Sequence, residues 1–129
     1  MNPIIISRFD ACRPALLKAF IEAPPGDYTG VFKILVSTIA HRNLLNLDPD
    51  RITVIDHGDY QGTLLFVVAN AGYQPNTFWT ATCAYGTCSG CDTMCGIRDG
   101  RGTVEENAKD YLTLALHLAQ SMRLVGGDI

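Results

Sequence analysis

The spacing of apolar residues changes along the chain from a helical period to an alternating one and back again. A helix is expected over about Pro14–Glu22, because proline suits a first helical turn and the run 23–26, Ala-Pro-Pro-Gly, ends the helix. A second helix is expected over about Tyr28–Leu45, whose apolar residues recur mostly at helical spacing. The short apolar stretch Ile4–Ile6 precedes both helices.

The middle of the chain has the pattern of β-strands. Strands are expected over Arg51–Asp56, Thr63–Ala69 and Thr77–Tyr85, with Asn46–Asp50 as a turn before them and the glycine-bounded loop His57–Gly62 closing a hairpin. The third strand alternates, which places one set of side chains on a common face: Trp79, Ala81, Cys83 and Tyr85.

The C-terminal third returns to a helical period. Thr103 and Glu106 have the spacing of a capping box, and a helix is expected from there to about Leu124, ended by Gly126 and Gly127. The expected order is therefore α-α-β-β-β-α, an α+β fold in which about three helices pack on a three-stranded antiparallel meander, within a single domain spanning residues 1–129. Because Leu64–Val68 is apolar on both faces, a homodimer is expected to cover the second face.

Charge limits the classes of partner. The formal net charge is −3, and no Lys or Arg lies between Arg51 and Arg98, so no nucleic-acid partner is indicated. The N-terminus lacks the basic region of a secretory signal, and the longest apolar run is far too short for a membrane span. A cytoplasmic location follows as the default, in which cysteines stay reduced.

Four of the five cysteines gather between Cys83 and Cys95. Cys88-x-x-Cys91 has the spacing at which a tight turn directs two sulfurs at one metal ion, and a helical step of four would bring Cys95 beside Cys91. Cys83 or His57 would complete a tetrahedron. Since thiolates are soft ligands, the expected metal is zinc, with an iron–sulfur cluster as the weaker choice. Two alternatives stay open: a redox dithiol, and cysteines that only pack.

Two resemblances accompany these motifs. The segment 83–91, Cys-Ala-Tyr-Gly-Thr-Cys-Ser-Gly-Cys, resembles the cluster loop of plant-type [2Fe–2S] ferredoxins, although no cysteine follows Cys95 to supply that family's distant fourth ligand. The segments 50–68, 85–93 and 110–117 resemble a family of small uncharacterised phage and bacterial proteins. In that family the cysteines matching Cys88 and Cys91 recur, which the resemblance implies to be the core pair. The family brings no function to carry over.

These observations favour a small non-enzymatic binding protein with a protein partner, which the resemblance implies to be encoded by a phage or mobile element. The alternative is a thiol-redox or metal-dependent enzyme that uses Cys88 and Cys91. No Ser-based nucleophile motif, phosphate-binding loop or dinucleotide-binding glycine pattern is present. His41 and His117 are interpreted as helix residues and not as ligands, and the polar residues of His57–Gly62 as turn formers.

Overall fold

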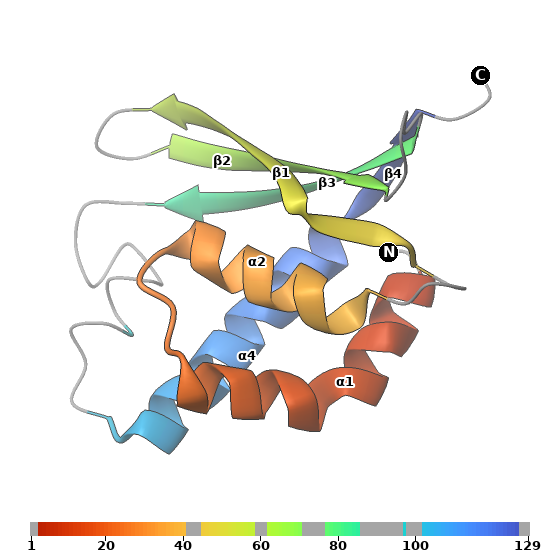
Figure 1. Ribbon diagram of the computed structural model, residues 1–129. Helices are drawn as coiled ribbons and strands as arrows, with labels where there is room; N and C mark the ends of the chain where they lie inside the picture. The colour runs from red at the N-terminus through yellow and green to blue at the C-terminus, as the bar shows by residue number, and fades with distance from the viewer. Residues whose placement is uncertain are drawn as a thin grey trace.

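The computed structural model describes residues 3–40, 45–58, 62–70, 77–85, 97 and 102–126. These residues form three helices and one antiparallel sheet of four strands, in the order β1-β2-β3-β4 (Figure 1). The helices are α1 (Pro3–Glu22), α2 (Tyr28–Ile39) and α4 (Val104–Ser121). The strands are β1 (Leu47–Gly58), β2 (Gly62–Asn70), β3 (Thr77–Tyr85) and β4 (Arg123–Gly126). The α+β class expected from the sequence is confirmed.

The sheet has a fourth strand where the sequence predicts three. The last helix ends at Ser121 and not near Leu124, and the chain then turns at Met122 to pair β4 with β3 from Thr77↔Gly126 to Thr80↔Arg123. Met122 has an extended backbone, with φ −66° and ψ 132°, so the helix ends before the glycines that were expected to end it.

Helix bounds differ from the sequence prediction at two more places. α1 begins at Pro3, so Pro14 lies inside the helix, although an internal proline removes one backbone hydrogen bond. α2 ends at Ile39 and not near Leu45. Its N-terminus is capped by Asp27, whose carboxylate accepts a 2.7 Å hydrogen bond from the Gly30 N–H.

The first strand also differs from its predicted bounds. β1 begins at Leu47, inside the segment Asn46–Asp50 that was predicted to be a turn.

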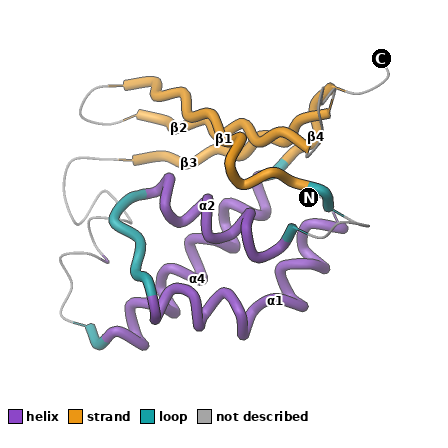
Figure 2. The backbone as a smooth tube through the Cα atoms, in the orientation of Figure 1, coloured by secondary structure: helices purple, strands orange, loops and turns teal. Residues whose placement is uncertain are grey.

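All three helices lie on one side of the sheet (Figure 2). α2 and α4 contact the strands directly, and α1 packs on α2 and α4. Of the helices in the described part of the chain, none combines the length and apolar character that a bilayer crossing requires.

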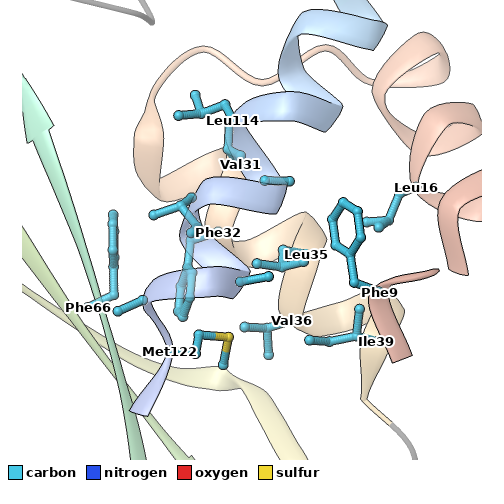
Figure 3. Packing of buried hydrophobic residues seen from close by; sticks show 14 of the residues in the cluster. Phe9, Leu16, Val31, Phe32, Leu35, Val36, Ile39, Phe66, Leu114 and Met122 are labelled. Atoms are coloured by element: carbon cyan, nitrogen blue, oxygen red, sulfur yellow. The ribbon is translucent and has the colours of Figure 1, made fainter. Parts of the chain in front are cut away.

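The hydrophobic core fills the space between the sheet and the helices. Phe66 of β2 points toward α2 and stacks on Phe32 with ring centroids 4.7 Å apart and an interplanar angle of 17° (Figure 3). Both rings are fully buried. The other fully buried large side chains come mainly from the helices: Phe9, Phe20, Ile5, Leu16, Leu35, Ile39, Leu118 and Met122.

The central strand is covered by helices on one face only. Phe66 and Val68 are buried, whereas Leu65 and Val67, which point to the other side, are half-buried. The apolar run Leu64–Val68 therefore has a helix-covered face and a second face without a helix against it among the described residues.

Candidate functional site

Two segments that stand out in the sequence leave the sheet at the same end. β1 ends at Gly58, β2 begins at Gly62 and β3 ends at Tyr85, and these three residues are neighbours in register, as Gly58↔Gly62 and Gly62↔Tyr85 (Figure 1). His57 is paired with Thr63 one row further into the sheet. The chain therefore enters its cysteine-rich segment beside the end of the hairpin.

Cys83 lies on the helix-covered face of β3, at the end of its row of buried side chains. Because side chains alternate along a strand, Cys83 shares its face with Trp79 and Ala81, both of which are buried. Cys83 itself is partly exposed and packs against the edge of the core. Its Sγ donates to the Ala84 carbonyl oxygen at 3.5 Å.

Beyond the last residue that pairs with β4, the edge of β3 is held by a side chain of α4. Pairing with β4 stops at Thr80. The Thr82 N–H then donates to Ser121 Oγ at 3.1 Å, and the Ser121 hydroxyl is 2.8 Å from the Leu118 carbonyl oxygen. This contact fixes the last turn of α4 against β3, next to Cys83.

A pocket of about 240 Å³ lies between this edge of β3 and α4. One wall is formed by Thr82, Cys83 and Ala84, and the opposite wall by α4. The α4 residues that line it are Leu114, His117 and Leu118. A thiol and an imidazole, two of the side chains that bind zinc most readily, thus share one pocket with two leucines.

The structure describes part of the predicted metal site. Of the candidate ligands, Cys83 is in the described residues, while Cys88, Cys91 and Cys95 lie outside them. Within the described ranges, no group of three or more His, Cys, Asp or Glu side chains is arranged to hold a metal ion. Within the described residues, Cys83 lines the same pocket as His117.

His117 lines this pocket, although its sequence position predicts a helix residue and not a ligand. It is exposed and directly precedes Leu118 of the buried stripe of α4, so its helical position alone suggests a surface residue. Only the packing of α4 on β3 places His117 in the same pocket as Cys83, and no pattern of neighbouring residues predicts that packing.

A second feature is the face of the sheet that points away from the helices, here called the open sheet face. Its central rows on β1, β2 and β3 are Thr53–Val67–Thr80 and Ile55–Leu65–Thr82, which carry no charge, and the first row continues to Arg123 on β4. Ile55 is 41% exposed, and Val125 on β4 is 48% exposed. Among the residues whose side chains the structure describes, the positions of this face are Arg51, Thr53, Ile55, Thr63, Leu65, Val67, Ala69, Phe78, Thr80, Thr82, Ala84, Arg123 and Val125.

Comparison with known proteins gives no assignment: no family model, curated protein or solved structure matches the chain.

Proposed function

We propose that the protein is a small non-enzymatic binding protein that forms a homodimer through the open sheet face. The observation that carries this proposal is the uncharged centre of that face, where Leu65 and Val67 are flanked by Ile55 and by threonines. Exposed apolar patches of this kind mark interaction surfaces. The resemblance noted above makes a phage or mobile element its proposed source.

A second copy of the chain is the occupant that fits this face. A two-fold dimer brings the same patch of both copies together, so the patch must be self-complementary. Rows of Thr, Val, Ile and Leu meet this condition because no charge is buried at their centre. Arg123 lies at the β4 end of the row Thr53–Val67–Thr80, and Arg51 precedes Thr53 by two residues on β1. Both charges therefore lie outside the centre of the face.

The size of the face supports a reversible dimer. Three strands about 30 Å long and the four-residue β4, about 13 Å long, at a spacing of about 4.8 Å give roughly 500 Å² per copy. Two copies would bury roughly 1,000 Å², at the lower limit of about 1,000 Å² for a specific interface. The proposal therefore predicts an association that depends on protein concentration and not an obligate dimer.

The thiol segment supports a zinc site as a second candidate. Cys83 presents a partly exposed thiol to a pocket, and Cys88 and Cys91 follow it with chelating spacing. We propose that zinc, if bound, is held through Cys88 and Cys91, with Cys95 and Cys83 as further ligands. The alternative is an enzyme that uses Cys88 and Cys91 as a redox pair, which requires one thiol with a lowered pKa.

Sedimentation velocity over a wide concentration series tests the dimer. The expected result is a sedimentation coefficient that rises with concentration from the value for a 14.0 kDa monomer toward that of a dimer. A monomer at every attainable concentration would contradict the proposed self-association.

Elemental analysis tests the zinc site separately. About one equivalent of zinc in the wild type, lost in a Cys88→Ser/Cys91→Ser variant, is the expected result. Metal-free protein that takes up no zinc on reconstitution under reducing conditions would contradict it.

A further inference from the structure

We propose that the outer edge of β1 binds an extended, basic peptide segment of a partner protein, which adds to the sheet as a further antiparallel strand. The part of β1 concerned is Ile52–Gly58. Strand addition draws its affinity from main-chain hydrogen bonds and its specificity from alternate side chains. This edge is a different surface from the open sheet face, so the inference goes beyond the proposed homodimer.

The backbone of this segment offers a regular edge for pairing. In the described part of the sheet β1 is an edge strand, because its strand partner there is β2 alone. Ile52–Gly58 pairs with β2 without interruption, from Ile52↔Val68 to Gly58↔Gly62. An antiparallel strand uses the N–H and C=O groups of alternate residues for one neighbour, so those of the intervening residues point outward. The segment therefore presents a row of donors and acceptors to a further strand.

The side chains of this segment are accessible on both faces of the sheet. Thr53, Val54, Ile55 and Asp56 are all exposed, with exposed fractions of 38% at Val54 and 41% at Ile55. Successive side chains of a strand point to opposite faces, so exposure of all these residues means that neither face is covered here. In Figure 1 the segment forms the arrowhead half of β1, at the upper margin of the sheet. A docking strand thus meets apolar side chains without displacing a described element.

Protection against strand pairing is uneven along the sheet edges. Natural edges are commonly blunted by short strands, proline, lysine or bulges. β4, at the opposite edge, has only four residues, and the first part of β1 contains Pro49 and a shift of register between Leu47 and Ile52. Ile52–Gly58 contains neither proline nor lysine. The edge that is open to pairing is therefore confined to one half of β1.

A second copy of the chain does not fit this edge. Two edge strands related by a two-fold axis run antiparallel, and residues that lie opposite each other must point to the same face. Only registers centred on a residue meet this condition. Centred on position 53, 54 or 55, the pairing puts Asp56 opposite one of three residues of the second copy, respectively Asp50, Ile52 or Val54. Each register sets a carboxylate against a like charge or an apolar side chain, which disfavours self-pairing.

The charges along β1 favour a basic partner strand. β1 carries three aspartates and one arginine, and that arginine, Arg51, already pairs with Asp48 at 3.2 Å. β2 and β3 carry no charged residue. Asp56 shares the face of Val54 and Ile52 by alternation. A strand with lysine or arginine opposite Asp56 and β-branched residues opposite the two apolar positions is therefore the complementary occupant.

Two synthetic peptides test the proposal in calorimetric titrations of the full-length protein. The basic probe, Lys-Thr-Val-Thr-Ile-Thr-Lys, places its first lysine opposite Asp56 when it runs antiparallel to β1. The control, Glu-Thr-Val-Thr-Ile-Thr-Glu, keeps the apolar residues and reverses the charges. The basic peptide should bind at least about tenfold more tightly, because like charges opposite each other are unfavourable. Amide hydrogen exchange within Ile52–Gly58 should slow when the basic peptide is present.

Charge reversal on the protein side identifies the position that the peptide contacts. Asp56→Lys should reverse the preference, so that the acidic peptide becomes the tighter ligand. Asp110→Lys is the matched control, because Asp110 is an exposed residue of α4 and its replacement changes the net charge by the same amount. It should keep the wild-type preference. Val54→Lys should weaken both peptides, since it places a charge against an apolar residue of the added strand.

Several outcomes would overturn the inference. These are equal affinity for the two peptides, no binding of the basic peptide, slowed exchange on strands other than β1, or a preference that Asp110→Lys reverses as Asp56→Lys does. Self-association of the wild type that Val54→Lys abolishes would identify a second copy as the occupant and would also overturn it. Val54 points to the helix side of the sheet, opposite Phe66, so this result is distinguishable from a dimer formed through the open sheet face.

Discussion

The Thr82 N–H donates to Ser121 Oγ at 3.1 Å, directly beyond the point where β4 stops pairing with β3. One side chain at the end of α4 thereby takes the place of a strand partner and joins the helix to the sheet beside Cys83. Ser121→Ala should destabilise the protein by about 0.5–1.5 kcal/mol, the usual net value of one hydrogen bond.

Amide hydrogen exchange checks this contact at the residue concerned. Exchange at Thr82 should accelerate in Ser121→Ala. Ser37→Ala is the control, because the exposed Ser37 hydroxyl only donates to the Lys33 carbonyl within α2. Equal exchange at Thr82 in the wild type and in Ser121→Ala would show that the contact does not hold the strand edge.

The stacked pair Phe32 and Phe66 connects α2 to the central strand, so Phe66→Ala leaves a cavity between the sheet and the helices. Such a truncation should cost about 3–5 kcal/mol of unfolding free energy. Val104→Ala, at a residue that is 50% exposed, should change stability by no more than about 0.5 kcal/mol. Denaturant titrations of the two variants give the comparison, and similar midpoints would place Phe66 outside the core.

The N-cap of α4 is a third test of the fold. Thr103 Oγ1 accepts a 3.1 Å hydrogen bond from the Glu106 N–H, so Thr103→Ala should destabilise the protein by about 0.5–2 kcal/mol. Thr113→Ala in the middle of the same helix should be neutral or slightly stabilising, since alanine is the better helix former. Thermal unfolding distinguishes the two, and an equal effect would mean that the cap contributes nothing.

Thiol reactivity against pH separates the zinc protein from the redox enzyme. In zinc-loaded protein the cysteine segment should react slowly with a thiol reagent, and a chelator should release fast-reacting thiols. A redox pair would instead show, without any metal, a thiol that titrates below the reference value of about 8.5. Rates that are the same with and without chelator would count against the zinc site.

The elements with complete local signals are the ones that the sequence predicts well. The alternation of Thr77–Tyr85 gives β3 with its observed bounds, and the Thr103 and Glu106 pair marks the start of α4 one residue before Val104. Both signals are contained within a few neighbouring residues. They do not depend on what packs against the element.

Two predictions fail for different reasons. α1 carries buried residues at Ile5, Phe9, Leu16 and Phe20, a helical spacing visible in the sequence, but the interpretation of Pro14 as a helix start hides it. β4 has only four residues, and Leu124 is 55% exposed, so pairing with β3 and not an apolar pattern makes it a strand.

The candidate site, too, was predictable from the sequence only in part. Spacing predicts Cys88 and Cys91 as a chelating pair, and alternation places Cys83 on the helix-covered face of β3. Neither signal can connect Cys83 with His117, because that neighbourhood arises only when α4 packs across the sheet.

Sedimentation equilibrium of Leu65→Lys beside Val104→Lys tests the proposed dimer most directly. Leu65 lies in a central row of the open sheet face, where a lysine from each copy would put like charges into the interface. Val104 is an exposed apolar residue at the start of α4, away from that face. With both variants folded by circular dichroism, Leu65→Lys should be monomeric at concentrations where the wild type and Val104→Lys associate. Association of Leu65→Lys as strong as that of the wild type would contradict a dimer formed through the open sheet face.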